Sequence, residues 1–425
     1  MAVSERPAVG ANGLANIAEA NDSSSPRAEG EAHVKTGLDL ARLEEADAPI
    51  RSLMPEPGRA ERLERAVSTA PNGPLCGVVV GVKDIFHVDG LPTTAGSTLP
   101  VNELAGPEAA AVSLLRGAGA VVLGKTVSTE FALFEPGPTC NPRNLAHTPG
   151  GSSSGSAAAV AAGHCPLALG SQTIGSVIRP AAFCGVVGYK PSYGRISTAG
   201  VIPLAESFDT VGLLASNVSW VERVAGVLCA WWRRGAVNFL PVLGVPDGPY
   251  LEQASEEALR VLHGLEATRV PLFEDIQTLN AAHRSLLTFE MARHHARWFP
   301  RFADRYRPRT AGAIRDGLAV ADDDAAQIRA GRANVRARIH EAMDASGVDV
   351  WVCPAAAGPA PEGWESTGDP SMQLPWTHAG LPVVTLPWGT AANGLPLGLQ
   401  VVARFMDDER LLAWAAQLEG ATPAV

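Results

Sequence analysis

Short apolar runs alternate with amphipathic stretches along this chain, and this alternation constrains the fold more than any other sequence feature. Residues 76–86 (CGVVVGVKDIF) are apolar and rich in valine, which predicts a buried strand. Residues 108–118 (EAAAVSLLRGA) have the spacing of an amphipathic helix, and residues 120–124 (AVVLG) follow as a second strand. A chain that alternates in this way is expected to form an α/β fold.

The two ends of the chain contribute similar elements. Residues 38–69 have a helical pattern that is interrupted by prolines. Near the C-terminus, residues 348–356 (VDVWVCPAA) and 381–389 (LPVVTLPWG) predict strands, and residues 398–420 predict a strand followed by a helix. Strands from both ends most simply belong to one sheet.

We therefore expect a single domain over residues 37–425, in which a variable section at about 215–345 is mostly helical. Residues 1–36 have the composition of a disordered segment, without the basic and apolar regions of a secretory signal. No apolar run is long enough to cross a bilayer.

Charge and cysteine content restrict the partners. The formal net charge of −10 argues against nucleic acid, which requires clustered lysine and arginine. The six cysteines are scattered, which is typical of free thiols in a reducing cytoplasm, and the histidines lack the spacing of a zinc site. We expect a cytoplasmic protein that acts on a small molecule, uses no metal or cofactor, and binds no membrane; a homodimer stays open.

The scarcity of lysine makes each lysine informative. Of the 34 basic residues, only Lys35, Lys83, Lys125 and Lys190 are lysines. Lys83 lies within the apolar run 76–86, where burial would lower its pKa and favour the neutral amine. A neutral amine can act as a general base. The alternative is a structural lysine that pairs with the adjacent Asp84.

Two further motifs allow other chemistry. Residues 119–126 (GAVVLGKT) satisfy the Walker A pattern, but their four central residues favour a strand that ends at Gly124 over a phosphate loop. Residues 151–155 (GSSSG) satisfy the G-x-S-x-G pattern, with Ser153 as the nucleophile and His378 as an available histidine. The preceding segment is rich in turns and lacks the strand that this motif needs.

Longer stretches of the sequence resemble the amidase signature family, whose members are Ser–cis-Ser–Lys amidohydrolases. The resemblance covers roughly residues 38–420. The matching stretches are 81–97 (GVKDIFHVDGLPTTAGS), 124–132 (GKTVSTEFA), 149–163 (PGGSSSGSAAAVAAG), 170–197 (GSQTIGSVIRPAAFCGVVGYKPSYGRIS) and 207–212 (SFDTVG), together with AGLPVVTLP and GLPLGLQVVARF near the C-terminus. The family fold is a mixed central β-sheet covered by helices on both faces, and we expect this architecture here.

The resemblance implies a role for several residues. Lys83 matches the base, Ser152 matches the bridging serine after a cis peptide bond, and Ser176 matches the nucleophile. Ser176 would attack an amide carbonyl and form an acyl-enzyme. The backbone N–H groups of Thr173, Ile174, Gly175 and Ser176 would form the oxyanion hole, and Ser154 and Ser171 would support the network.

The substrate is less constrained. Several segments, SVIRPAA among them, look most like malonamidase, which implies that Arg179 binds a substrate carboxylate; a structural role for Arg179 is the alternative. Ile174 replaces the usual glycine of the oxyanion loop, so the loop has ordinary backbone and an apolar acyl pocket, or it is impaired. Gln172 stands where many relatives have aspartate.

Three functions remain open at this point. A small acid amide of the malonamate type is the first candidate substrate. Aryl amides, esters or carbamates could react on the same triad. The chain could also be the A-type subunit of an amidotransferase that acts in a complex.

Overall fold

The computed structural model describes residues 38–233, 237 and 239–420. The segment 1–36, which the sequence predicts to be disordered, lies outside these residues, as does Lys35. In the described part of the chain, no helix is long and apolar enough to span a membrane.

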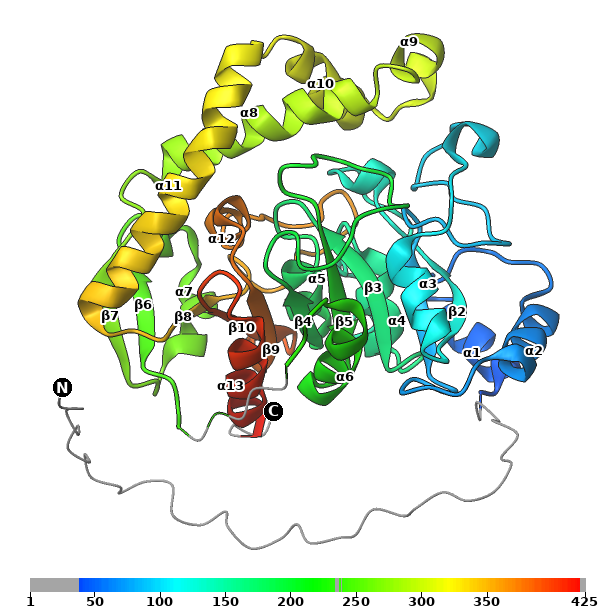
Figure 1. Cartoon of the computed structure of the whole chain (residues 1–425), viewed down its shortest axis with the longest axis horizontal. Coiled ribbons are helices and arrows are strands. Elements are labelled where there is room, and N and C mark those ends of the chain that lie inside the picture. The colour runs from blue at the N-terminus through cyan, green and yellow to red at the C-terminus, as the bar shows by residue number, and fades with distance from the viewer. Residues whose placement is uncertain (1–37, 234–236, 238, 421–425) are drawn as a thin grey trace, which may run out of the picture. The chain divides into compact units, whose positions relative to one another are not determined.

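A ten-stranded mixed sheet forms the centre of the fold, with the strand order β2-β1-β3-β5-β4-β9-β10-β8-β6-β7 (Figure 1). The strands are β1 (Val79–Lys83), β2 (Val121–Thr126), β3 (Leu167–Gln172), β4 (Val187–Lys190), β5 (Thr210–Ala215), β6 (Leu243–Asp247), β7 (Ala267–Pro271), β8 (Val350–Pro354), β9 (Val383–Thr390) and β10 (Pro396–Val402). The helices are α1 (Leu40–Asp47), α2 (Arg59–Thr69), α3 (Ala110–Gly117), α4 (Ser154–Ala161), α5 (Ile178–Cys184), α6 (Val218–Leu228), α7 (Glu256–Leu259), α8 (Ile276–His294), α9 (Phe299–Phe302), α10 (Pro308–Leu318), α11 (Asp322–Ser346), α12 (Leu374–Ala379) and α13 (Asp408–Gly420).

The sheet has parallel pairs at its two ends and antiparallel pairs between them. β1 pairs in parallel with β2 and β3, and β6 pairs in parallel with β7 and β8. β5, β4, β9 and β10 are antiparallel to their neighbours. Strands from both ends of the chain therefore share one sheet, as the sequence predicts.

Successive residues of the strands point to opposite faces, and around β1, β2 and β3 the two faces contribute to different apolar clusters. Along β3, Leu167 and Leu169 join the larger cluster, whereas Ala168 joins a smaller one. Helices α3 and α6 bring their apolar side chains to the larger cluster, and α4 brings its alanines to the smaller one. Helices therefore cover both faces, which confirms the predicted architecture.

Strand β2 is at one edge of the sheet, where unpaired backbone groups would be exposed. The segment before α2 covers this edge: Met54 N donates to the Lys125 carbonyl at 2.8 Å, and Leu53 forms a bridge with Thr126. Further along, Arg62 donates to the carbonyls of Val122 and Leu123 at 2.7 and 2.8 Å. The segment before α2 and the side chain of Arg62 therefore bind the backbone groups of this edge strand.

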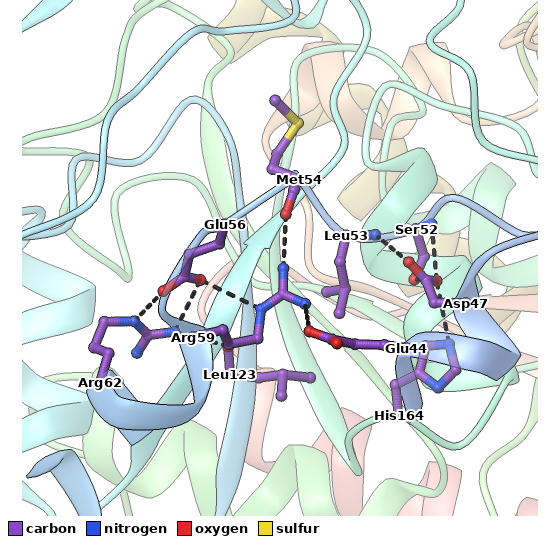
Figure 2. Close-up of polar contacts among 10 residues, drawn as sticks. All are labelled: Glu44, Asp47, Ser52, Leu53, Met54, Glu56, Arg59, Arg62, Leu123 and His164. Carbon is purple, nitrogen blue, oxygen red and sulfur yellow. Dashed lines mark hydrogen bonds and ion pairs between the residues drawn. The ribbon is translucent and has the colours of Figure 1, made fainter. Parts of the chain in front are cut away.

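Figure 2 shows how this covering segment is held. Glu56 binds Arg59 and Arg62, and Arg59 also donates to the Met54 carbonyl at 2.7 Å. Asp47 accepts hydrogen bonds from the backbone of Ser52 and Leu53 and lies 3.2 Å from His164 Nε2. These contacts fix the turn between α1 and α2 against β2.

The Walker A stretch is part of this edge strand. β2 continues to Thr126 instead of ending at Gly124, because its last residues pair with Val82 and Lys83 of β1 on one side and with Leu53 and Met54 on the other. Lys125 is buried and forms an ion pair with Asp84, with Nζ and Oδ1 2.8 Å apart. The backbone N–H groups of this stretch do not converge into a phosphate loop.

The section predicted to be mostly helical contains two strands as well. β6 and β7 extend the sheet, and the sequence pattern missed β7 because its side chains are largely exposed. The remainder is helical: α8 packs on α10, α11 and α12, and Figure 1 shows α8, α10 and α11 standing together beyond the sheet. α8 also supplies residues to the site described below.

Candidate active site

The carboxyl ends of two parallel strands bring the predicted base to its neighbours. β1 ends at Lys83 and β3 ends at Gln172, and Val82 is paired with Leu169 between them. Because neighbouring parallel strands end at the same edge of a sheet, Lys83 and Ser171 meet there. The loop of residues 173–177 then connects β3 to α5.

Lys83 is fully buried, at 0% exposure. Its Nζ lies 2.7 Å from Ser152 Oγ and 2.9 Å from Ser171 Oγ. Among the described residues, none forms a salt bridge with it. Burial lowers the pKa of Lys83 to about 7, against the opposing effect of the Asp209 carboxylate. The geometry is that of a desolvated amine between two hydroxyl groups.

Ser152 is positioned by an unusual stretch of backbone. The peptide bond between Gly151 and Ser152 is cis, the geometry that the family resemblance implies for the bridging serine. Arg179 donates to the Gly151 carbonyl at 2.8 Å, and Thr129 N donates to the Ser152 carbonyl at 3.2 Å. A Cβ on Gly151 would lie 2.8 Å from Thr367 Cγ2, so a larger residue would not fit here.

Ser176 is the most accessible of the three predicted catalytic residues, at 8% exposure compared with 2% for Ser152. Its carbonyl accepts a hydrogen bond from Ser153 N at 3.2 Å, which ties the loop to the Ser152 segment. The hydrogen bonds of the described residues include none between the Ser152 and Ser176 hydroxyls. Ser176 lines a small pocket together with Ile174, Arg179 and Leu287.

The oxyanion loop points its carbonyls away from this pocket. The Thr173 carbonyl accepts from His283 Nε2 at 3.1 Å, and the Ile174 carbonyl accepts from Thr377 Oγ1 at 2.6 Å. The Gly175 carbonyl accepts from Arg179 N at 3.0 Å. The backbone N–H groups of Ile174, Gly175 and Ser176 have no acceptor within the described part of the chain. They are therefore available to a ligand in the pocket.

Ile174 does not distort this loop. It is absent from the residues with positive φ, so its backbone conformation is ordinary for a β-branched residue. Its side chain lines the pocket, along with Leu133, Phe134 and Leu204. Of the two alternatives that the sequence left open, the structure favours the ordinary backbone with an apolar pocket wall.

Gln172 supports the loop in a way that the sequence analysis did not predict. Its Oε1 accepts from the backbone N–H groups of Val177 and Ile178 at 2.9 and 3.0 Å. These N–H groups lie at the start of α5, where they have no acceptor within the helix. Its Nε2 donates to Thr377 Oγ1 at 3.0 Å, and Thr377 in turn holds the Ile174 carbonyl. The only sequence signal was that glutamine replaces the aspartate of many relatives.

Two buried histidines support the same loop from behind. Because a carbonyl only accepts, His283 Nε2 carries the proton that it donates to Thr173. When both rings are neutral, His283 Nδ1 accepts from His378 Nδ1, 3.3 Å away. Burial lowers the pKa of both histidines, to about 3 for His378. No sequence motif marked His283, which lies on α8 in the variable section.

The remaining predicted residues divide into two groups. Ser171 contacts Lys83, as expected of a supporting hydroxyl, whereas Ser154 Oγ donates to the Val127 carbonyl at 3.3 Å and caps backbone only. Ser153 Oγ is buried against the Ser171 backbone at 3.3 Å. Since His378 contacts His283 instead, the structure forms no Ser153–His378 pair.

Arg179 is buried, and most of its guanidinium is occupied. Its Nε donates to the Thr367 carbonyl at 2.7 Å, and its Nη2 donates to Gly151 and to Thr367 Oγ1. Its Nη1 has no hydrogen-bond partner, and no described carboxylate forms a salt bridge with it. Burial lowers its pKa to about 10, which Asp369 opposes. Arg179 thus lines the Ser176 pocket without a salt bridge to any described carboxylate, although the charge of Asp369 acts on it.

Comparison with known proteins agrees with this geometry. The family model described as Amidase matches residues 42–263 and 293–412. The chain is 31% identical over 427 residues to the A subunit of glutamyl-tRNA(Gln) amidotransferase from a Cyanothece species, covering 86% of this chain and 88% of the relative. It is similar to a crystal structure of an amidase with a TM-score of 0.81 and 30% identity, which covers 91% and 95% of the two chains.

A second solved structure is that of a peptide amidase in complex with the competitive inhibitor chymostatin. It has a TM-score of 0.73 and 28% identity, and covers 91% of this chain and 93% of that one. The family match spans most of the described residues, including Lys83, Ser152 and Ser176. The chain belongs to the amidase signature family.

Proposed function

We propose that this protein is a serine amidohydrolase that cleaves a carboxylic amide through an acyl-enzyme on Ser176. Neutral Lys83 accepts the proton of Ser152 while Ser152 accepts that of Ser176, and the Ser176 oxygen attacks the amide carbonyl. The proton returns through Ser152 to the leaving amine as the C–N bond breaks. Water, activated by the same relay, hydrolyses the ester and frees Ser176.

The observation that carries this proposal is the environment of Lys83. A buried amine without a carboxylate partner, 2.7 Å from a serine hydroxyl, is suited to receive a proton near neutral pH. Buried lysines with structural roles have other partners, Asp84 for Lys125 and the Pro191 carbonyl for Lys190, whereas Lys83 lies between two serine hydroxyls. The relay would close when substrate binding brings the Ser176 hydroxyl to Ser152, since catalytic hydrogen bonds often tighten only in the complex.

The loop of residues 173–176 supports the same reaction. Residues 173–176 line the pocket of Ser176, where an oxyanion would form during attack, and the N–H groups of residues 174–176 have no acceptor in the described part of the chain. Each of the Thr173, Ile174 and Gly175 carbonyls is held by a separate partner, so the N–H groups are fixed before the substrate arrives. Loss of one such donor typically costs about 3–4 kcal/mol of transition-state stabilisation.

For the substrate, we propose a small acid amide of the malonamate type. Arg179 offers an unpartnered Nη1 in the same pocket as Ser176, and a buried cation without a salt bridge to a described carboxylate favours an anionic ligand. The pocket is small, which suits a short acyl group. Aryl amides, esters and carbamates are the alternative, supported by the apolar wall of Ile174, Phe134 and Leu287.

A second candidate is the A-type subunit of an amidotransferase. Its support is the similarity over most of the chain to glutamyl-tRNA(Gln) amidotransferase A subunits, among them one from Methanosarcina acetivorans at 34% identity over 406 residues. This function predicts weak hydrolysis by the isolated chain and a stable complex with companion subunits. Size-exclusion chromatography of the native protein from its host separates the two candidates.

The site is tested with a serine-directed fluorophosphonate and with a substrate screen. We expect labelling at Ser176 that disappears in Ser176→Ala while circular dichroism stays native. In the screen, ammonia or amine release is measured on acid amides, aryl amides and carbamates. Arg179→Ala should abolish release from the acid amides only; equal loss on every substrate would assign Arg179 a structural role.

We also infer that residues 37–425 act as a single amidase domain. The support is that strands from both ends of this range are hydrogen-bonded in one sheet.

A further inference from the structure

Asp209 lies between the two halves of the site. It directly precedes β5, within the SFDTVG stretch, and it is only partly buried. Its Oδ1 accepts the hydroxyl of Thr173 at 2.6 Å, at the first residue of the oxyanion loop. Its Oδ2 accepts the backbone N–H groups of Leu204 and Ala205 at 2.8 and 3.1 Å. Leu204 is itself a wall of the Ser176 pocket.

The same carboxylate acts on the base. It is the one charged group that raises the pKa of Lys83, in opposition to the effect of burial. Burial raises the pKa of Asp209 to about 6, and the hydrogen bond from Thr173 and the charge of Lys83 lower it. Ser171, which contacts Lys83 Nζ, lines a second pocket together with Asp209, Glu206 and His294. These are the titratable groups that face Asp209.

We propose that Asp209 is a positioning residue that links the lysine base to the oxyanion loop. Through Thr173 it fixes the start of the loop that binds the oxyanion, and its negative charge favours the protonated form of Lys83. This inference rests on the proposed function of Lys83 and Ser176. Asp209 touches no reacting atom; it acts through Lys83 and Thr173.

A purely structural carboxylate would behave differently. It would hold the 204–205 turn, and its loss would lower stability without moving the pH dependence of the nucleophile. A residue that acts on Lys83 must move that dependence in a defined direction. Removal of the negative charge lowers the pKa of Lys83, so the neutral amine persists to lower pH.

The test measures the second-order rate of fluorophosphonate labelling at Ser176 from pH 5 to pH 9, which requires no known substrate. Asp209→Asn keeps the size of the side chain and removes its charge. We expect the acidic limb of its profile to shift down by about 0.5–1 pH unit, with a plateau rate about threefold to tenfold lower. Thr173→Val keeps the charge and should lower the plateau by about tenfold without moving the limb.

Glu206→Gln is the matched control, because Glu206 is an exposed carboxylate of the same pocket whose side chain bonds neither Thr173 nor Leu204. Its profile should match the wild type. If the acidic limb of the Asp209→Asn profile lies at the same pH as that of the wild type, or is shifted no further than that of Glu206→Gln, the link to Lys83 is refuted. If Asp209→Asn does not fold, Thr173→Val decides alone, and an unchanged plateau overturns the proposal.

The proposed function and this inference fail under different results. Absence of labelling in the wild type at every pH would remove the proposed function and, with it, this inference. Labelling of the wild type with no effect of Asp209→Asn and Thr173→Val would leave the function standing and remove the inference alone.

Discussion

The replacement Lys83→Met should separate the catalytic use of a buried amine from its effect on stability. The pKa of Lys83 is about 7 in the folded chain, compared with about 10.4 for a free lysine. Between these values the unfolded chain holds a proton that the folded chain lacks. Stability therefore rises as the pH rises through this window, by about 1.4 kcal/mol per unit for one such lysine.

The magnitude follows directly. From pH 7.5 to pH 9.5, Lys83 should contribute about 2.5 kcal/mol of increasing stability to the wild type. Lys83→Met lacks this contribution. The free energy of unfolding of the variant, taken relative to the wild type, should therefore fall by about the same 2.5 kcal/mol over that range. Groups that titrate equally in both proteins cancel in the difference.

Lys190 provides the control. It is as fully buried as Lys83, its pKa is also lowered to about 7 by burial, and its Nζ donates only to the Pro191 carbonyl. Lys190→Met should change the pH dependence of stability by a similar amount while fluorophosphonate labelling continues. Lys83→Met should lose labelling. The two variants thus share the change in the pH dependence of stability and differ in fluorophosphonate labelling.

Chemical unfolding at pH 7.5, 8.5 and 9.5, followed by circular dichroism, measures the stability difference. If the difference between Lys83→Met and the wild type stays constant within about 0.5 kcal/mol over these pH values, the folded lysine is charged. The neutral-base mechanism would then be wrong, whatever the labelling shows.

Three further substitutions test other parts of the structure. Ser152→Ala removes the relay and should slow labelling by about 10²–10⁴-fold with little loss of secondary structure; a rate within tenfold of the wild type would exclude the relay. Gln172→Leu leaves two N–H groups of α5 without their acceptor and should cost about 2–4 kcal/mol in chemical unfolding, together with a lower labelling rate. Arg62→Met uncovers two carbonyls of the edge strand and should cost about 1–3 kcal/mol while labelling is unchanged; a slower rate would contradict a purely structural role for this edge.

Sequence patterns predicted the strands near the two ends of the chain better than those in its middle. The strands β1, β2, β8, β9 and β10 were visible as apolar runs, and α3 and α13 as amphipathic stretches. The strands β3, β4, β5 and β6 were not assigned; β3 and β4 lie in a stretch dense in glycine and other small residues, which gives no clear helix or strand pattern. β7 carries exposed side chains and a proline, so it has no apolar signal.

The candidate site shows the same division. Lys83 was marked by its apolar surroundings, whereas the roles of Ser152 and Ser176 followed only from the family resemblance. The residues that support the loop of residues 173–176 were not predicted. Asp209, His283 and Thr377 reach the oxyanion loop from three different elements, and nothing near them in the sequence indicates a common partner.

Local residue patterns were sufficient to specify an α/β fold with a lysine inside an apolar strand, because such patterns encode strands and their burial. The folded arrangement was needed to show that this lysine has serine hydroxyls and no carboxylate beside it. It was also needed to show that Ile174 leaves the loop of residues 173–176 undistorted and that Arg179 forms no salt bridge with a described carboxylate. These properties depend on distances between residues far apart in the chain, and such distances exist only once the sheet has formed.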